Sequence, residues 1–271
     1  DMIEKIAYEL MSPDQIKTFE ASWEMNLSFG VPNVGNFRVN IFRQRGSTSI
    51  VIRFILGNIP AMGELGLPNI LGELIMEKRG LILIVGATGS GKSTTIASML
   101  DHRNANRSGH ILTVEDPIEF LFKHKKSIVN QREIGMDTMD WQSALKNAMR
   151  QAPDCILIGE IRDKETMQAA ISYAQTGHLC LATLHANNSY HALNRIISFF
   201  PLENRPALFL DLSVALRAIV SQRLVKKLDG KRIPTSEIML NTRHISELIE
   251  RGEVQGIKDA MEQTLAPGSQ T

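Results

Sequence analysis

Residues 86–93, GATGSGKS, have the types and spacing that suit the binding of phosphate groups. They match the pattern G-x-x-x-x-G-K-[ST] at every fixed position. Glycines let successive backbone N–H groups turn toward one anion, and a following helix adds positive charge at its N-terminus. Lys92 supplies a point charge for the β- and γ-phosphates, and the Ser93 hydroxyl is a suitable Mg²⁺ ligand. The predicted phosphate cradle consists of Gly86, Ala87, Thr88, Gly89, Ser90, Gly91, Lys92, Ser93 and Thr94.

A phosphate cradle indicates a nucleotide, but hydrolysis also needs carboxylates near the γ-phosphate. The apolar run 155–159 precedes Glu160, and the run 111–114 precedes Glu115, Asp116 and Glu119. A single carboxylate after a strand is more often a solvated turn residue. Carboxylates that follow successive strands after a phosphate cradle are better candidates, because ligands of open α/β sheets lie at the carboxyl ends of the strands. Glu160 fits a Walker B strand, whose acidic residue polarises a water or supports Mg²⁺.

Two histidines, His178 and His185, flank the apolar run 179–183. Their spacing of seven residues does not suit two metal ligands on one helical turn, and no cysteine or carboxylate cluster completes a metal site. They are either packed or capping residues, or they contact the γ-phosphate at the edge of the nucleotide site.

Four arginines lie in the N-terminal part of the chain, namely Arg38, Arg43, Arg45 and Arg53. Strand alternation places some charges on a solvated sheet face, which is the simpler interpretation. Alternatively, some of them reach a phosphate in their own subunit or in a neighbouring one. A charge supplied in trans in this way can raise a rate by roughly 10³- to 10⁵-fold.

The elements that must position these residues change character along the chain. Residues 16–56 have a β-rich pattern, and residues 57–69 contain three glycines and two prolines, which predicts a linker or hinge. From residue 70 onward, helical stretches alternate with the apolar runs 81–85, 111–114, 155–159 and 179–183. Such runs are typical of parallel strands buried on both faces, joined by right-handed crossovers. After about residue 206 the pattern predicts helices only, over 206–228, 242–252 and 254–265.

Composition sets limits on the class of protein. The chain has 271 residues and a net charge of +1, which leaves room for two domains but gives no support for a nucleic-acid-coating surface. Its two cysteines form no Cys-x-x-Cys pair, so a disulfide framework or a cysteine-built zinc site is not expected. Neither a signal-peptide core nor an apolar run of about 20 residues is present, so we expect a cytoplasmic protein.

Five segments together resemble the secretion-superfamily ATPases: GATGSGKST, ILTVEDPIEF, NQREIG, ILIGEIRD and TGHLCLATLHANNS. Within that superfamily they are similar to the twitching-motility retraction ATPases of type IV pili, the PilT/PilU family, over nearly the whole chain. The resemblance implies an α/β fold, with a RecA-like P-loop motor domain over 70–271, a 57–69 linker and a smaller α+β PAS-like domain over 1–56. Compared with the family's, we expect that N-terminal domain to be incomplete in this sequence.

The resemblance also implies an activity and partners. Members hydrolyse ATP with Mg²⁺ and form hexameric rings with ATP at the interface between domains. They act in the cytoplasm, peripherally at the inner membrane, against the platform protein of the pilus. A paralogous retraction ATPase is a further possible partner, and nucleic acid is not expected.

Family roles transfer to individual positions of this chain. The aspartate box lies on residues 111–120, where Glu119 would activate the attacking water, and Glu160 is the Walker B glutamate, which with Ser93 would hold Mg²⁺. The histidine box lies on residues 176–189 and contains His178 and His185. The N-terminal arginines that complete the nucleotide site correspond best to Arg38 and Arg53, and less closely to Arg45.

Two features favour one branch. Extension and secretion ATPases usually carry a four-cysteine zinc insertion, which this chain lacks. The C-terminal retraction motif AIRNLIRE corresponds to HISELIERGE, where Ser246 replaces the first arginine. These features predict an accessory, PilU-type retraction motor. The alternatives are an ATP-binding scaffold for a partner ring, and a pilus-extension or type II secretion ATPase.

Overall fold

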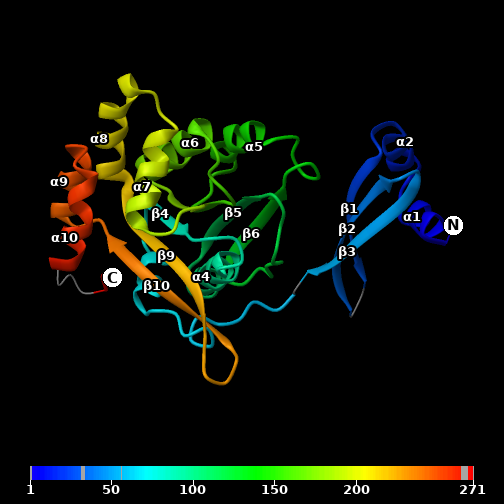
Figure 1. Ribbon diagram of the computed structural model, residues 1–271, viewed down its shortest axis with the longest axis horizontal. Helices are drawn as coiled ribbons and strands as arrows, with labels where there is room; N and C mark the ends of the chain where they lie inside the picture. The colour runs from blue at the N-terminus through cyan, green and yellow to red at the C-terminus, as the bar shows by residue number, and fades with distance from the viewer. Residues whose placement is uncertain (1, 32–33, 56, 264–267, 271) are drawn as a thin grey trace. The chain divides into compact units, whose positions relative to one another are not determined.

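The computed structural model describes residues 2–31, 34–55, 57–263 and 268–270 (Figure 1). The chain divides into two compact units, one of Asp1–Asn58 and Glu119–Leu121 and one of Ile59–Ile118 and Phe122–Thr271. Leu56, the last residue of the predicted N-terminal domain, lies outside the described residues.

The first unit contains two helices and an antiparallel sheet. Helices α1 (Met2–Leu10) and α2 (Pro13–Ser22) precede strands β1 (Glu24–Val31), β2 (Gly35–Gln44) and β3 (Ser47–Ile55), in the order β1-β2-β3. The Ser12 side chain accepts from the N–H of Gln15, whose side chain bonds back to Ser12, so a capping box starts α2. Residues 16–22 were therefore wrongly assigned to the β-rich region, whereas the rest of that region contains strands as predicted.

A small core joins the helices of this unit to one face of its sheet. It consists of Ala7, Met11, Phe19, Leu27, Val39 and Ile41. Arg43 lies at the edge of this core, where its guanidinium donates to Glu4 Oε1 at 2.9 Å and stacks over the Phe19 ring at 5.3 Å. Arg43 therefore stabilises its own unit through these contacts.

The second unit is built on a seven-stranded sheet in the order β10-β9-β4-β8-β7-β5-β6. Its strands are β4 (Gly80–Val85), β5 (Gly109–Glu115), β6 (Ser127–Glu133), β7 (Cys155–Ile158), β8 (Leu179–Leu184), β9 (Leu216–Lys226) and β10 (Arg232–Leu240). All neighbouring pairs are parallel except β9 and β10, which form an antiparallel hairpin. The four predicted strands are confirmed, and they lie in the middle of the sheet.

Helices cover both faces of this sheet (Figure 1). The helices are α3 (Ile70–Ile75), α4 (Lys92–Asn106), α5 (Trp141–Ala148), α6 (Lys164–Gln175), α7 (Ser189–Ser198), α8 (Arg205–Ala215), α9 (Arg243–Glu250) and α10 (Ile257–Gln263). In β4, Leu81, Leu83 and Val85 pack toward α5–α10, and Ile82 and Ile84 pack toward α3 and α4. This confirms the predicted α/β architecture with a smaller N-terminal unit.

The predicted helix over residues 206–228 is wrong in its second half. Helix α8 ends at Ala215, and Leu216–Lys226 form strand β9, which pairs with β4 on one side and β10 on the other. Short apolar runs do not separate buried strands from buried helices by periodicity alone. Here the β-branched Ile219 and Val220 pair with Leu83 and Ile84 of β4 inside the sheet, and tertiary pairing decides the outcome.

Both cysteines are free and fully buried. Burial raises the pKa of the Cys155 thiol to about 11. Within the described residues, the helices are too short or too polar to cross a lipid bilayer.

Candidate active site

The predicted cradle connects the end of β4 to the start of α4. Gly91 is the N-cap of α4 and has φ of 86°, and Gly89 has φ of 77°, both in the left-handed region that favours glycine. At Gly86 an added Cβ would lie 2.4 Å from the carbonyl oxygen of Gln222. At Gly91 it would lie 2.9 Å from Gln222 Nε2. The loop therefore needs glycine for its backbone conformation and for its close approach to β9.

The polar groups of this loop suit an anion. The Lys92 side chain is 8% exposed, and its Nζ donates to the carbonyl oxygens of Gly86 at 2.9 Å and Ala87 at 3.0 Å. The buried Ser90 hydroxyl has no hydrogen-bond partner among the described residues. The first turn of α4 also directs unpaired backbone N–H groups toward the loop. A cradle with these donors fits the phosphates of a nucleotide.

Gln222 on β9 holds the loop, and the sequence pattern did not indicate it. It is 1% exposed, its Nε2 donates to the Ser90 carbonyl at 2.7 Å, and its Oε1 accepts from Thr95 Oγ1 at 2.7 Å. One amide therefore ties both the loop and the first turn of α4 to the sheet. The signal in the sequence was a polar residue within a largely apolar segment. Because that segment was assigned to a helix, the contact of Gln222 with the cradle was not predicted.

Replacing Gln222 with leucine should lower both stability and nucleotide affinity. The change leaves a buried carbonyl and a buried hydroxyl without partners, which costs about 1–3 kcal/mol of unfolding free energy. Urea unfolding and binding of a fluorescent ATP analogue measure the two effects. Thr95→Val should show the smaller effect because it breaks only one hydrogen bond. The control is Gln142→Leu, since Gln142 is an exposed residue of α5. Wild-type affinity in folded Gln222→Leu would contradict the assigned role.

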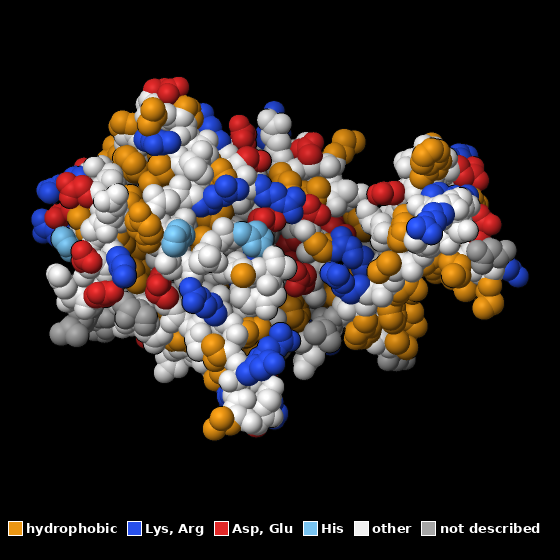
Figure 2. Space-filling model, in the orientation of Figure 1, with side chains coloured by type: hydrophobic (Ala, Val, Ile, Leu, Met, Phe, Trp, Pro, Cys, Tyr) orange, Lys and Arg blue, Asp and Glu red, His pale blue; other side chains and the backbone are white. Residues whose placement is uncertain are grey.

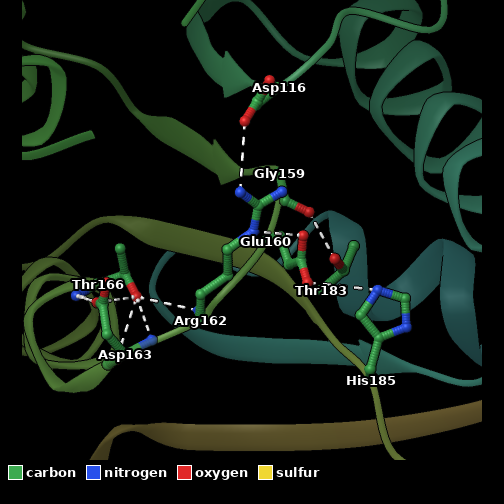
Figure 3. A network of polar contacts seen from close by, with 8 residues as sticks. All are labelled: Asp116, Gly159, Glu160, Arg162, Asp163, Thr166, Thr183 and His185. Atoms are coloured by element: carbon green, nitrogen blue, oxygen red, sulfur yellow. Dashed lines mark hydrogen bonds and ion pairs between the residues drawn. The ribbon is translucent and has the colours of Figure 1, made fainter. Parts of the chain in front are cut away.

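Three neighbouring strands of the same sheet end in polar residues that contact one another (Figure 3). Asp116 follows β5, Glu160 follows β7 and His185 follows β8. Glu160 Oε1 lies 3.3 Å from His185 Nε2, and Glu160 Oε2 accepts from Arg162 Nε at 2.7 Å. Arg162 Nη1 lies 3.4 Å from Asp116 Oδ2. Figure 2 shows acidic, basic and histidine side chains gathered on this face of the larger unit.

Arg162 joins this network, although the sequence analysis assigned it no role. Its hydrogen bond to Glu160 raises the pKa of the Arg162 guanidinium. Its backbone N–H donates to Thr166 Oγ1 at 3.3 Å, inside the capping box that Asp163 forms at the start of α6. The sequence could have indicated this contact, because Arg162 lies two residues after Glu160 in the segment GEIRD.

The network and the cradle lie at the same edge of the sheet. Val85 pairs with Leu184 across β4 and β8, so Gly86 and His185 occupy neighbouring positions after their strands. Adjacent strands lie about 4.8 Å apart, and β7 with Glu160 is the next strand after β8. The geometry therefore brings Glu160 and His185 beside the cradle.

His178 lies at the opposite edge. It precedes Leu179, which pairs with Gly80 at the start of β4, and its Nδ1 contacts the Tyr173 carbonyl at 3.2 Å. A strand rises about 3.3 Å per residue, so the length of β8 separates the two histidines by about 20 Å. His178 therefore has a packed or capping position, the first of the two interpretations, whereas contact with the γ-phosphate stays a prediction for His185.

The other predicted carboxylates have different surroundings. Glu119 is exposed and forms no hydrogen bond or ion pair with any residue that the structure describes. Glu115 accepts from Thr113 Oγ1 at 2.7 Å. Glu133, which is buried, accepts from the backbone N–H of Ile118 at 2.9 Å and so fixes the turn that precedes Glu119. The predicted role of Glu119 in activating the attacking water stays a prediction.

The N-terminal arginines fall into two places on their own sheet. Arg38 and Arg53 face each other across β2 and β3, so one phosphate could contact both. Arg45 lies in the β2–β3 turn beyond the last pair, Gln44 and Ser47, with φ of 49°. It is seven residues from Arg38 along an extended strand, or about 20 Å, so these two arginines cannot contact the same phosphate group.

Among the residues that the structure describes, no three histidine, cysteine or carboxylate side chains form a group that could hold a metal ion. Mg²⁺ keeps several waters and shares substrate phosphates with one or two protein oxygen ligands. The Ser93 hydroxyl at the start of α4 and the Glu160 carboxylate supply ligands of that kind.

Comparisons with known proteins agree with this geometry. The family model described as "Type II/IV secretion system protein" matches residues 24–264. The type IV pilus ATPase PilU of Pseudomonas aeruginosa is 49% identical over 263 residues, 97% of this chain and 69% of PilU. The type IV pilus retraction ATPase PilT of the same species is 41% identical over 269 residues, 99% of this chain and 78% of PilT.

A solved structure shows the same fold. The crystal structure of the pilus retraction motor PilT with bound ADP has a TM-score of 0.92 and 45% identity, covering 96% of this chain and 76% of that one. The chain therefore belongs to the type II/IV secretion system protein family and, within it, to the nucleotide-binding ATPases of the PilT/PilU type.

Proposed function

We propose that the chain is a Mg²⁺-dependent ATP-hydrolysing motor that assembles as a homo-hexamer and powers retraction of type IV pili. The observation that carries this proposal is the phosphate cradle beside Glu160 and His185, in a chain 49% identical to a type IV pilus ATPase. PilT, which is named as a pilus retraction motor, shares the fold over nearly the whole chain.

Each part of the site has a role in the proposed reaction. Lys92 and the backbone N–H groups of residues 86–91 hold the phosphates, and Ser93 and Glu160 would hold Mg²⁺. When bound, Mg²⁺ neutralises charge that develops on the phosphates. Glu119 accepts a proton from the attacking water.

The N-terminal unit and the linker complete the proposed motor. Arg38 and Arg53 supply positive charge to the phosphates from their own or a neighbouring subunit, and Arg45 is the weaker candidate. Residues 57–69 would act as the hinge between an N-terminal domain over 1–56 and the ATPase domain over 70–271. Glycines in this linker tolerate the φ/ψ changes that a rotation of one domain against the other requires.

The branch that we propose is the accessory, PilU type. Identity is higher to PilU than to PilT, at 49% against 41%. Ser246, which replaces the first arginine of the retraction motif, donates to the Ser213 carbonyl at 2.9 Å and so joins α9 to α8. We therefore propose that the chain works with a paralogous retraction ATPase.

The proposed surroundings follow from the pilus function. The motor would act in the cytoplasm, peripherally at the inner membrane, against the platform protein at the pilus base. It has no role with nucleic acid in this proposal, consistent with its net charge of +1.

Steady-state ATP turnover of the purified chain, with its mass measured by light scattering, tests the proposal. We expect turnover that requires Mg²⁺ and a mass near six times 30.2 kDa. ATP binding without turnover would favour the coupling-scaffold alternative. Turnover that DNA stimulates would favour a nucleic-acid motor, and absence of ATP binding would overturn the proposal altogether.

A further inference from the structure

Arg162 occupies the place between two carboxylates at the carboxyl edge of the sheet (Figure 3). Its Nε donates to Glu160 Oε2 at 2.7 Å, and its Nη1 lies 3.4 Å from Asp116 Oδ2. The other oxygen of Glu160, Oε1, lies 3.3 Å from His185 Nε2. Both oxygens of the carboxylate that would support Mg²⁺ therefore already have a nitrogen partner.

The backbone around Arg162 is fixed independently of its guanidinium. The Ile161 N–H donates to the Thr183 carbonyl at 2.8 Å, and the Gly159 N–H donates to the Val114 carbonyl at 2.8 Å. The Arg162 N–H itself contacts Thr166 at the start of α6. Movement of the guanidinium would leave these backbone bonds in place, so the side chain can change partners without disturbing the strands.

The ion pairs of Arg162 are exposed enough to be replaced. The side chains of Arg162, Asp116 and Glu160 are 50%, 36% and 25% exposed. Pairs of this kind contribute little to stability, because water and salt screen them. A divalent cation with phosphate ligands binds carboxylate oxygen more strongly, and it repels a guanidinium at the same position.

We propose that Arg162 is a displaceable counter-ion of Glu160. It positions the carboxylate when no Mg²⁺ is bound, and it gives up that carboxylate when Mg²⁺ arrives with the nucleotide. Arg162 is then a positioning residue that sets the Mg²⁺ concentration at which the site fills. This inference rests on the proposed function, since it assumes a Mg²⁺-bound nucleotide in the cradle.

Binding of a fluorescent, non-hydrolysable ATP analogue tests the proposal without relying on turnover. Its affinity is measured in excess EDTA and then along a Mg²⁺ titration, for the wild type, Arg162→Gln and Arg162→Lys. For Arg162→Gln we expect the same affinity as the wild type in EDTA. The midpoint of its Mg²⁺ titration should lie at a Mg²⁺ concentration about two- to fivefold lower than that of the wild type. Arg162→Lys should resemble the wild type because lysine keeps the charge.

A matched control removes an arginine–glutamate pair elsewhere. Arg243 donates to Glu247 at 3.0 Å on α9, and Arg243→Gln should leave the Mg²⁺ titration unchanged. Circular dichroism checks folding of each variant, and Arg162→Ala replaces Arg162→Gln if the latter does not fold.

Two results would overturn the counter-ion role. One is a Mg²⁺ titration of Arg162→Gln with the same midpoint as that of the wild type. The other is an equal loss of affinity with and without Mg²⁺, which would mean that Arg162 supports the fold or contacts the nucleotide directly. Failure of the proposed function is a separate result, because the wild type itself would then not bind the analogue.

Discussion

Replacement of Lys92 by alanine should lower ATP turnover by about 10²- to 10³-fold, the usual cost of removing one electrostatic contact to a reacting group. Lys92 Nζ lies inside the loop, bonded to the carbonyl oxygens of Gly86 and Ala87, at the place where the cradle receives the phosphates. Alanine keeps α4 intact because it has the highest helix propensity. The loss should therefore be one of nucleotide affinity and turnover, measured by analogue binding and phosphate release.

A control variant separates the effect of losing the Lys92 charge from the effect of losing any lysine charge. Lys258 on α10 is exposed, and its Nζ lies 4.0 Å from Glu262 Oε1, so Lys258→Ala removes a lysine that has no part in the cradle. It should keep wild-type turnover. Turnover of Lys92→Ala within a few-fold of the wild type would mean that the phosphates bind elsewhere.

The sequence predicted the cradle because its residues are contiguous. A phosphate loop needs particular backbone angles and donors within a few positions, so its pattern is visible without any knowledge of the fold. The central strands β4, β5, β7 and β8 were equally visible, since strands buried on both faces give short apolar runs.

Contacts between distant segments were not predictable in the same way. Gln222 contacts Ser90 and Thr95 across more than 120 positions of sequence, at 132 and 127 residues, and its strand had been assigned to a helix. The surroundings of the two histidines depend on a distant segment in the same way. They are seven positions apart, and the parallel register of β8 with β4 shows that His185 is the one at the same end of the sheet as the cradle.

The roles of Glu119 and Glu160 should separate when each is changed to glutamine. Glu119→Gln should lower turnover by about 10²- to 10⁴-fold, the usual contribution of a general base, and leave analogue affinity unchanged. Glu160→Gln should instead reduce the gain in affinity that Mg²⁺ provides, because the glutamine oxygen is a neutral and weaker ligand. Turnover and Mg²⁺-dependent binding, measured on both variants, compare the two carboxylates directly.

Each of the two variants is the control for the other, since both remove one negative charge at nearly constant side-chain size. The structure gives a reason to expect different outcomes. Glu160 is held by Arg162 and His185, as a ligand with a fixed position would be, whereas Glu119 is exposed and makes no such contact among the described residues. A general base must reach the attacking water, whereas both carboxylate oxygens of Glu160 already lie against nitrogen partners. If Glu160→Gln abolished turnover at unchanged Mg²⁺-dependent affinity while Glu119→Gln remained active, the water-activating role would belong to Glu160, and the assignment from family resemblance would be wrong.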